Sequence, residues 1–359
     1  MMEYKVYKWS DVLTIINGRN QNAVECEDGE YPIYGSGGVM GKANDYLCPP
    51  NCTIIGRKGN INKPIYVETK FWNVDTAFGL SANEEILNPR YLYYFCVDYN
   101  FERHNKAVTI PSLTKADLLK IEMCLPPLDK QKSIVGELDK INELIRLKKE
   151  QLKDYDNLAQ SIFYEMFGDP VVNEKGWEVK KLGDVCKFTQ GTQVPIEEQH
   201  LSKENGLVQF LRIIDFTQGK DAPRFVKCSN DKYILHEREI AIVRYGTPGF
   251  VCYGKIGAIA NNLFKITPNQ KDMFEFEFLV HWLNTEAFQS AVKSKQYGAA
   301  LQAIKFSTIQ GINIIIPSLT VQRSFATRIS QIDKQKKYIE ESIKDLETLL
   351  ASRMQYWFD

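Results

Sequence analysis

The sequence predicts an α+β protein in which two mixed domains are joined by two long helices that pack as an antiparallel coiled coil. An internal duplication of pseudo-twofold character is the main reason for this prediction. Residues 125–168 align with residues 316–359 at a constant offset of 191 without a gap, and Gln131 and Gln322 are among the identical pairs. Each copy follows a stretch of domain size, so a chain of 359 residues can contain two domains that each bury a core.

Both copies carry an apolar repeat with alternating steps of four and three residues, which is typical of a coiled coil. Lys148, Lys336 and Arg353 interrupt this repeat. A single helix cannot shield such a stripe from water, so we expect the helices, each roughly 55 Å long, to pack on each other. The expected seam residues are Ile134, Leu138, Ile141, Ile145, Leu152, Tyr155 and Ile162 in the first helix, and Phe325, Ile329, Ile332, Ile339, Ile343, Leu346 and Leu350 in the second.

The expected order is domain, helix, domain, helix. The two domains are also related to each other. The run that ends at Gly18 resembles the run that ends at Gly191, and the Arg-x-Gly sequence at Arg57 recurs at Arg244. An apolar run before each Arg-x-Gly sequence predicts a short buried strand followed by a basic turn. The expected bounds of the four segments are residues 1–127, 128–168, 169–318 and 319–359.

The offset between equivalent positions grows from 173 at the first glycines to 187 at the arginines and 191 in the helices. This growth predicts extra loops in the second domain. Further strands are expected at residues 63–67, 208–214 and 249–259, and shorter helices at residues 89–99 and 276–294.

Composition excludes several classes of protein. Lys+Arg and Asp+Glu both number 45, so the net charge is zero and the strongly basic balance of an independent nucleic-acid binder is absent. The eight cysteines contain no Cys-x-x-Cys pair, which favours reduced structural thiols. We expect a cytoplasmic protein without a membrane partner, since the sequence has neither an apolar leader nor a long uncharged run.

The order of these parts resembles the specificity subunit of a type I restriction-modification system. The resemblance rests on the duplicated Pro-x-Leu-x-x-Gln helix and on the Phe167-Gly-Asp-Pro170 link into the second domain. The runs Tyr31-Pro-Ile-Tyr-Gly-Ser-Gly-Gly38 and Thr53-Ile-Ile-Gly-Arg-Lys-Gly59 also resemble parts of that family's target-recognition domains.

The resemblance implies a non-catalytic subunit whose two target-recognition domains read a bipartite, asymmetric site in double-stranded DNA. Its partners would be two copies of an adenine methyltransferase subunit, which uses S-adenosylmethionine, and restriction subunits that cut DNA with ATP and Mg²⁺. This chain would bind no cofactor itself. The helices would act as a spacer between the half-sites and as a docking surface for the methyltransferase. An alternative is the targeting subunit of a related system in which one partner both methylates and cuts.

Candidate DNA contacts lie in polar or basic loops, because Arg, Asn, Gln and Lys side chains match base edges and phosphates. Such loops are also ordinary solvated surface in many proteins, and we favour the pair Arg57 and Arg244. The candidates are Arg57, Lys58, Asn60, Lys63, Arg103, His104, Asn105 and Lys106 in the first domain, and Gln190, Thr192, Gln193, Arg212, Arg244, Tyr245, Lys295, Gln296 and Tyr297 in the second.

The sequence is also compatible with two alternatives to DNA targeting. Asp45, Glu68 and Lys70 imitate the carboxylate and lysine spacing of a metal-dependent nuclease, but the second domain has no counterpart. A structural coiled-coil adaptor would need only the helices. No metal site is expected, since the four histidines are isolated and lack metal-ligand spacing.

Overall fold

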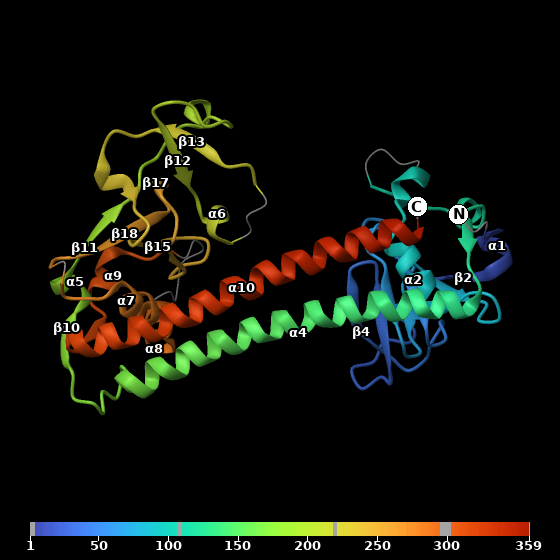
Figure 1. The fold of residues 1–359 in the computed structure, drawn as a ribbon, viewed down its shortest axis with the longest axis horizontal. Helices are drawn as coiled ribbons and strands as arrows, with labels where there is room; N and C mark the ends of the chain where they lie inside the picture. Colours follow the sequence, from blue (N-terminus) through green and yellow to red (C-terminus); the bar gives the residue numbers. More distant parts are fainter. Residues whose placement is uncertain (1–3, 106–109, 218–220, 271, 295–302, 359) are drawn as a thin grey trace. The chain divides into compact units, whose positions relative to one another are not determined.

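The computed structural model describes residues 4–105, 110–217, 221–270, 272–294 and 303–358 (Figure 1). The chain divides into two compact units. Unit 1 contains Met1–Glu150 and Glu340–Asp359, and unit 2 contains Gln151–Ile339. The two long helices, α4 (Leu128–Phe167) and α10 (Leu319–Phe358), therefore contribute one part to each unit. Within the described ranges, no helix has the length and apolar composition needed to span a membrane.

Unit 1 contains an antiparallel sheet with the strand order β2-β8-β5-β6 and a smaller sheet with the order β4-β3-β7, in which β3 and β7 are parallel. The helix α2 packs on β5 and buries Tyr91 and Phe95 in the same core as Phe78 and Leu80. The elements are β1 (Lys5–Lys8), α1 (Trp9–Val12), β2 (Leu13–Asn17), β3 (Tyr31–Gly35), β4 (Gly38–Ala43), β5 (Cys52–Gly56), β6 (Ile65–Val67), β7 (Trp72–Asn73), β8 (Ala77–Ala82), α2 (Pro89–Asp98), η1 (Phe101–His104), α3 (Lys115–Leu118) and β9 (Glu122–Leu125).

Unit 2 repeats this plan with the sheets β11-β18-β15-β16 and β13-β12-β17-β14. β12 and β17 are parallel, as are β3 and β7 in unit 1. The elements are β10 (Glu178–Lys181), α5 (Leu182–Val185), β11 (Cys186–Gln190), η2 (Ile196–Glu198), β12 (Leu207–Leu211), α6 (Ile213–Thr217), β13 (Arg224–Lys227), η3 (Asp231–Tyr233), β14 (Ile234–Leu235), β15 (Ile240–Val243), β16 (Val251–Cys252), β17 (Gly257–Ile259), β18 (Leu263–Pro268), α7 (Phe276–Leu283), α8 (Glu286–Ser294), α9 (Phe306–Gln310) and β19 (Asn313–Ile316).

The repeat therefore extends through the sheets, and the predicted fold class is confirmed. The strand β14 is an addition of unit 2, where it pairs with β17. Lys265 on β18 supports this addition, because its buried Nζ donates to the carbonyl of Ile234 at 2.8 Å and to Glu239 Oε2 at 3.1 Å. The extra loops predicted for the second domain thus include one complete strand.

Three predicted elements of unit 2 are shorter than expected. The strand expected at 208–214 ends at Leu211, because the Asp215 carboxylate accepts from the Arg212 N–H at 2.8 Å and the helix α6 starts at Ile213. The range 249–259 contains two strands separated by a turn at Gly254, where φ is +74°. The range 276–294 contains two helices, because Thr285 follows α7 and its hydroxyl bonds the Trp282 carbonyl at 2.7 Å.

The parts of α4 and α10 that belong to unit 1 pack antiparallel. Glu137 is bound by Arg353, with Nη2 and Oε2 3.1 Å apart, and Lys149 Nζ lies 2.8 Å from Glu347 Oε1. From the first pair to the second, the residue numbers increase in α4 and decrease in α10, so the two helices run in opposite directions.

Unit 2 shows the same direction in its own parts of the two helices. Lys336 Nζ lies 2.6 Å from Asp156 Oδ1, and Arg328 Nη1 lies 3.8 Å from Glu165 Oε1. Lys336, which interrupts the seam in sequence, keeps its charge paired at the edge of the apolar stripe. The same holds for Arg353 in unit 1.

All fourteen expected seam residues are buried or half-buried. The face that packs shifts near the end of α4, however. Phe163 and Phe167 are 1% and 0% exposed, whereas the neighbouring seam residue Ile162 is only half-buried. This shift occurs because the last turns of α4 also cover the core of unit 2, where both phenylalanine rings contact Phe278 and Phe325.

A buried glutamine ties the start of α4 to unit 1. Gln131 is fully buried, and its Nε2 donates to the carbonyls of Ile86 at 2.9 Å and Pro126 at 2.8 Å. Its Oε1 accepts from the Asn88 N–H at 2.8 Å. Asn88 is the N-cap residue of α2, so this one side chain joins the starts of two helices.

Gln322 does the same at the start of α10 in unit 2. Its Nε2 donates to the carbonyls of Met273 at 3.2 Å and Pro317 at 2.8 Å, and its Oε1 accepts from the Glu275 N–H at 2.9 Å. The identity of Gln131 and Gln322 in the duplicated sequence therefore has a structural cause, because only a primary amide supplies both donors and the acceptor.

We expect Gln131→Ala to lower the free energy of unfolding by about 3 kcal/mol, since it leaves one buried N–H and two carbonyls without these partners. Gln322→Ala should cost a similar amount. Denaturant unfolding of the full chain measures both. Gln151→Ala, at an exposed glutamine of α4, is the matched control and should change stability by less than about 0.5 kcal/mol. Losses at Gln131 and Gln322 no larger than the control's would contradict the anchoring role.

His281 is a half-buried titratable group within unit 2. It lies on α7, and its ring meets Phe325 of α10 in a T-shaped contact with centroids 5.2 Å apart. Burial, followed by the nearby charge of Lys336, lowers the pKa of His281 to about 4. The ring is therefore neutral in the folded protein at neutral pH.

Stability should depend on pH through this residue. The folded pKa of His281 lies below the ordinary value of about 6.5, so the unfolded chain takes up a proton first as the pH falls. The contribution is complete above pH of about 6.5 and is lost as the pH falls towards about 4. We expect His281→Gln to remove on the order of 2 kcal/mol of this decline in unfolding free energy. His236→Gln, at an exposed histidine, is the control. Equal declines in wild type and His281→Gln would disprove the assignment.

Candidate nucleic-acid interface

The basic turn after β5 presents the first group of candidate residues in unit 1. The Arg57 N–H donates to the Thr76 carbonyl at 2.8 Å, and the Arg57 carbonyl accepts from the Leu113 N–H at 2.9 Å. The chain doubles back tightly here, because a Cβ at Gly56 would lie 2.3 Å from the carbonyl oxygen of Asn60. Arg57, Lys58 and Asn60 are exposed on this turn.

Two other loops of unit 1 lie beside this turn. A Cβ at Gly37, in the β3–β4 hairpin, would be 4.0 Å from Asn60 Nδ2. The Phe101 N–H donates to Asn62 Oδ1 at 2.8 Å, which brings η1 next to the turn. Lys63 is exposed on the same segment. The structure thus gathers sequence-predicted residues from the turn and from η1.

His104 and Asn105 serve the loop itself. The His104 ring stacks on Tyr99 with centroids 5.8 Å apart, and its Nε2 lies 2.7 Å from the Tyr99 hydroxyl. Asn105 Oδ1 accepts from the Ser112 N–H at 3.1 Å. Arg103, in contrast, is exposed and is the better candidate contact of this group.

Arg244 in unit 2 is the structural equivalent of Arg57. Its N–H donates to the Asn262 carbonyl at 2.8 Å, and its carbonyl accepts from the Ile304 N–H at 2.9 Å. Arg57 makes the same two backbone hydrogen bonds, with Thr76 in the place of Asn262 and Leu113 in the place of Ile304. The Arg-x-Gly match therefore marks the same turn in both units, although Arg244 is half-buried and Arg57 is exposed.

An amide cluster beside this turn joins three predicted residues of unit 2. The Tyr245 hydroxyl donates to Asn261 Oδ1 at 3.1 Å, and Asn261 Nδ2 donates to Gln193 Oε1 at 3.3 Å. Gln190 Nε2 donates to the Asn261 carbonyl at 3.0 Å. Asn261, which stands in the turn between β17 and β18, is not among the residues predicted from the sequence. A pair of asparagines directly after an apolar run was the available signal.

The glycines that end the matched opening runs shape both interfaces. A Cβ at Gly18 would lie 1.8 Å from the Val74 carbonyl oxygen, and a Cβ at Gly191 would lie 2.2 Å from the Ala260 carbonyl oxygen. No other residue fits at these close backbone approaches.

The positions after these glycines are also equivalent. The Thr192 N–H donates to the Ile259 carbonyl at 2.9 Å, and the Arg19 N–H donates to the Asn73 carbonyl at 3.0 Å. Arg19 is exposed and was missed as a candidate, although the offset of 173 from Thr192 leads directly to it.

Arg212 has a structural role. Its Nε and Nη2 lie 3.1 Å from the two carboxylate oxygens of Asp215, and Nη2 also donates to the Ala222 carbonyl at 3.2 Å. These bonds occupy the guanidinium fork, so Arg212 supports the start of α6. Four further candidates, Lys106, Lys295, Gln296 and Tyr297, lie outside the described residues.

The three residues of the nuclease alternative are engaged with other groups of unit 1. Glu68 pairs with Arg90 at 3.0 Å, and the Lys70 ammonium lies 4.3 Å from the centroid of the Tyr46 ring. Asp45 Oδ1 accepts from the Tyr46 N–H at 2.8 Å. In the part of the chain that the structure describes, no group of three His, Cys, Asp or Glu side chains is arranged to hold a metal ion.

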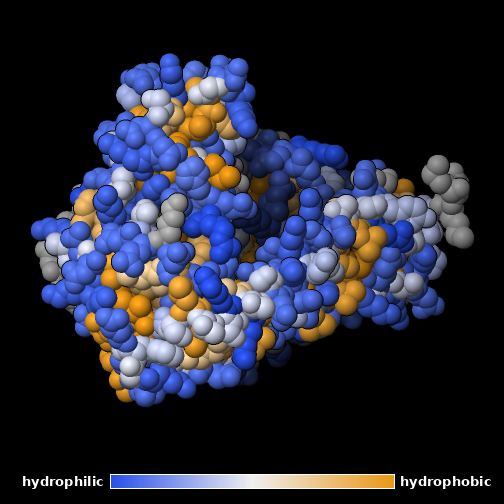
Figure 2. Space-filling model, turned by 60° about the vertical axis from the view of Figure 1, so that its left-hand side comes forward, coloured by the Kyte–Doolittle hydropathy of each residue, from blue (hydrophilic) through white to orange (hydrophobic). Residues whose placement is uncertain are grey.

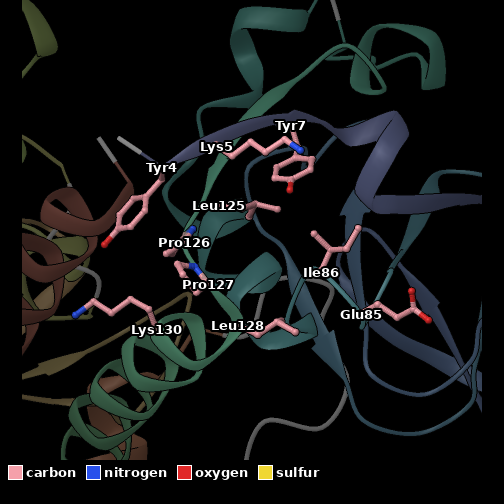
Figure 3. Close-up of a pocket in the computed structure, with 10 residues that line it drawn as sticks. All are labelled: Tyr4, Lys5, Tyr7, Glu85, Ile86, Leu125, Pro126, Pro127, Leu128 and Lys130. Atoms are coloured by element: carbon pink, nitrogen blue, oxygen red, sulfur yellow. The ribbon is translucent and has the colours of Figure 1, made fainter. Parts of the chain in front are cut away.

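A pocket of about 1000 Å³ lies beside the start of α4 in unit 1 (Figure 3). Tyr4, Lys5 and Tyr7 line it together with the Pro126–Pro127 segment and Lys130. None of the candidate DNA contacts within the described ranges is among its lining residues. The candidate interface is therefore an open surface of loops in each unit, separate from this pocket.

The long helices carry exposed apolar side chains. Leu158 of α4 and Leu349 of α10 occupy equivalent positions in the duplication, and each is 46% exposed. Leu147 and Tyr338, which are also equivalent, are 45% and 66% exposed. Figure 2 shows hydrophobic patches among mostly hydrophilic residues on the face that it draws. The two copies of the duplicated helix thus expose apolar side chains at the same positions.

Solved structures share this fold. The crystal structure of the type I restriction-modification S subunit from M. genitalium matches with a TM-score of 0.58 and 14% identity, covering 99% of this chain and 96% of that one. A structure described in connection with complex assembly and conformational transition of the type I R-M system matches with a TM-score of 0.59 and 18% identity, covering 99% and 97%. At these identities the likeness concerns the fold alone.

Sequence relatives are similar over much of the chain. The type I restriction enzyme MjaVIII specificity subunit of Methanocaldococcus jannaschii is 22% identical, with 98% of this chain and 92% of that protein covered. The MjaIX specificity subunit of the same organism is 25% identical over 67% of this chain, and the match spans 62% of its length. The family model described as the type I restriction modification DNA specificity domain matches residues 1–154 and 174–348. The chain therefore belongs to the type I restriction-modification DNA specificity family.

Proposed function

We propose that this chain is the DNA-targeting specificity subunit of a type I restriction-modification complex. Each unit reads one half of a split, asymmetric site in double-stranded DNA. The chain itself is non-catalytic, and partner subunits methylate adenine with S-adenosylmethionine and cut unmodified DNA with ATP and Mg²⁺.

One observation carries the proposal. The same two backbone bonds hold Arg57 in unit 1 and Arg244 in unit 2, so a basic turn recurs at an equivalent place. The side chains around the two turns differ, since unit 1 offers Lys58 and Asn60 where unit 2 offers Tyr245 and an amide cluster. A repeated frame with different polar groups suits two different half-sites.

The charge balance supports dependence on partners. The net charge is zero, and neutralised phosphates supply much of the affinity of proteins for DNA. Tight binding therefore needs cationic surface from a second protein. The exposed pairs Leu158/Leu349 and Leu147/Tyr338 on the helices are the proposed docking surface for two methyltransferase subunits, because an internal repeat offers the same surface twice.

Exchange of residues 1–127 for another recognition domain should alter one half of the methylated motif and leave the other half unchanged. The physical reason is that each unit has its own core and its own polar loops. A genome-wide map of methylated adenines, made with and without the exchange, measures the result. Loss of both half-sites in a complex that still assembles and methylates would contradict independent reading by the two units.

Removal of either equivalent arginine should weaken DNA binding by the assembled methyltransferase complex. We expect Arg57→Ala and Arg244→Ala each to lower the affinity by about tenfold, which corresponds to the loss of one guanidinium contact with base or phosphate. Fluorescence anisotropy at several salt concentrations measures the affinity. Lys120→Ala, at a lysine that is 75% exposed beside α3, is the control. Affinities equal to the control would remove both arginines from the interface.

A further inference from the structure

The amide cluster of unit 2 points to a residue that sets base preference indirectly. We propose that Asn261 is a positioning residue that fixes the amide of Gln193, so that unit 2 selects a base with a keto oxygen, guanine or thymine, at one position of its half-site. The inference rests on the function proposed above and adds a chemical rule for one of its two reading surfaces.

Asn261 holds three polar side chains at once. The Tyr245 hydroxyl donates to its Oδ1 at 3.1 Å, so its Nδ2 is directed to Gln193, where Oε1 accepts at 3.3 Å. Its backbone carbonyl accepts from Gln190 Nε2 at 3.0 Å. Asn261 is half-buried, whereas Gln193 is exposed, so the cluster supports Gln193 from behind.

This arrangement decides which end of the Gln193 amide is free. Oε1 is turned towards Asn261, and the end that remains is Nε2 with its N–H donors. In the major groove, guanine and thymine present keto oxygens as acceptors, whereas adenine and cytosine present amino groups as donors. A glutamine that recognises adenine uses its amide oxygen and its amide nitrogen together, in two hydrogen bonds to the same base. A held Gln193 therefore favours a keto base.

The equivalent place in unit 1 has different chemistry. Asp75 precedes Thr76 just as Asn261 precedes Asn262, and the carbonyls of Thr76 and Asn262 accept the equivalent Arg57 and Arg244 N–H groups. An ionised carboxylate only accepts hydrogen bonds, so Asp75 cannot hold a neighbouring amide by its oxygen as Asn261 does. This turn is thus a position where the two units differ in polarity within a common backbone.

Asn261→Asp tests the proposal, because it replaces one donor by an acceptor with little change in shape. The carboxylate should accept from Gln193 Nε2, turning the amide so that Oε1 faces the base. In maps of methylated adenines, we expect one position of the unit 2 half-site to change its preference from guanine or thymine to adenine or cytosine by at least tenfold. The unit 1 half-site and the gap should be unchanged. The exchange of residues 1–127 identifies which half-site belongs to unit 2.

Two further variants complete the experiment. Gln193→Glu also replaces the donor end by an acceptor and should shift the same position in the same direction, even where Asn261→Asp fails to fold. Asn230→Asp is the matched control, because Asn230 Oδ1 accepts from the Lys232 N–H at 3.2 Å and a carboxylate keeps that bond. It should leave the whole motif unchanged.

The outcomes separate the two levels of inference. An unchanged unit 2 half-site in both Asn261→Asp and Gln193→Glu complexes that methylate DNA would overturn the role of Asn261. A shift in Gln193→Glu but not in a folded Asn261→Asp complex would also overturn it, since Gln193 would then act without support. Absence of any split methylated motif with the wild-type chain would instead overturn the proposed function itself.

Discussion

The closure of each unit's core by parts of both long helices is the constraint on which the rest of the structure depends. In unit 1 the core includes Ile134 and Leu138 of α4 and Met354 of α10. In unit 2 it includes Phe163 of α4 and Phe325 of α10. Residues of both helices belong to both cores, so the helices are structural parts of the units as well as a connection between them.

Backbone groups that surround them restrict several positions that the two units share. The buried amides of Gln131 and Gln322 form hydrogen bonds through both the nitrogen and the oxygen. At Gly18 and Gly191, a Cβ would overlap a backbone carbonyl oxygen. These positions tolerate few side chains because their neighbours are backbone groups that cannot move aside. The exposed loops carry no such restriction. A common scaffold therefore presents two different sets of polar side chains.

The polar residues of the loops fall into two groups. One group forms hydrogen bonds within the protein, and the other has polar groups exposed to solvent. Arg212, His104 and Asn105 have the composition of DNA contacts, yet their polar atoms hold α6 and the loop after η1. Arg57, Arg103 and Gln193 keep exposed polar groups on supported turns. The hydrogen bonds behind this partition join residues three to seven positions apart, and residue type alone does not show them.

The sequence by itself determined the duplication, the helix seam and the equivalent glycines and arginines, and hence the fold class. Periodicity and constant offsets can be read directly from the order of the residues. Tertiary structure decided that Phe163 packs more deeply than Ile162 and that Asn261 lies at the centre of an amide cluster. Each of these depends on which atoms meet across a fold. Hydrogen bonds and burial between distant segments leave no local pattern in the sequence, so only the folded chain shows them.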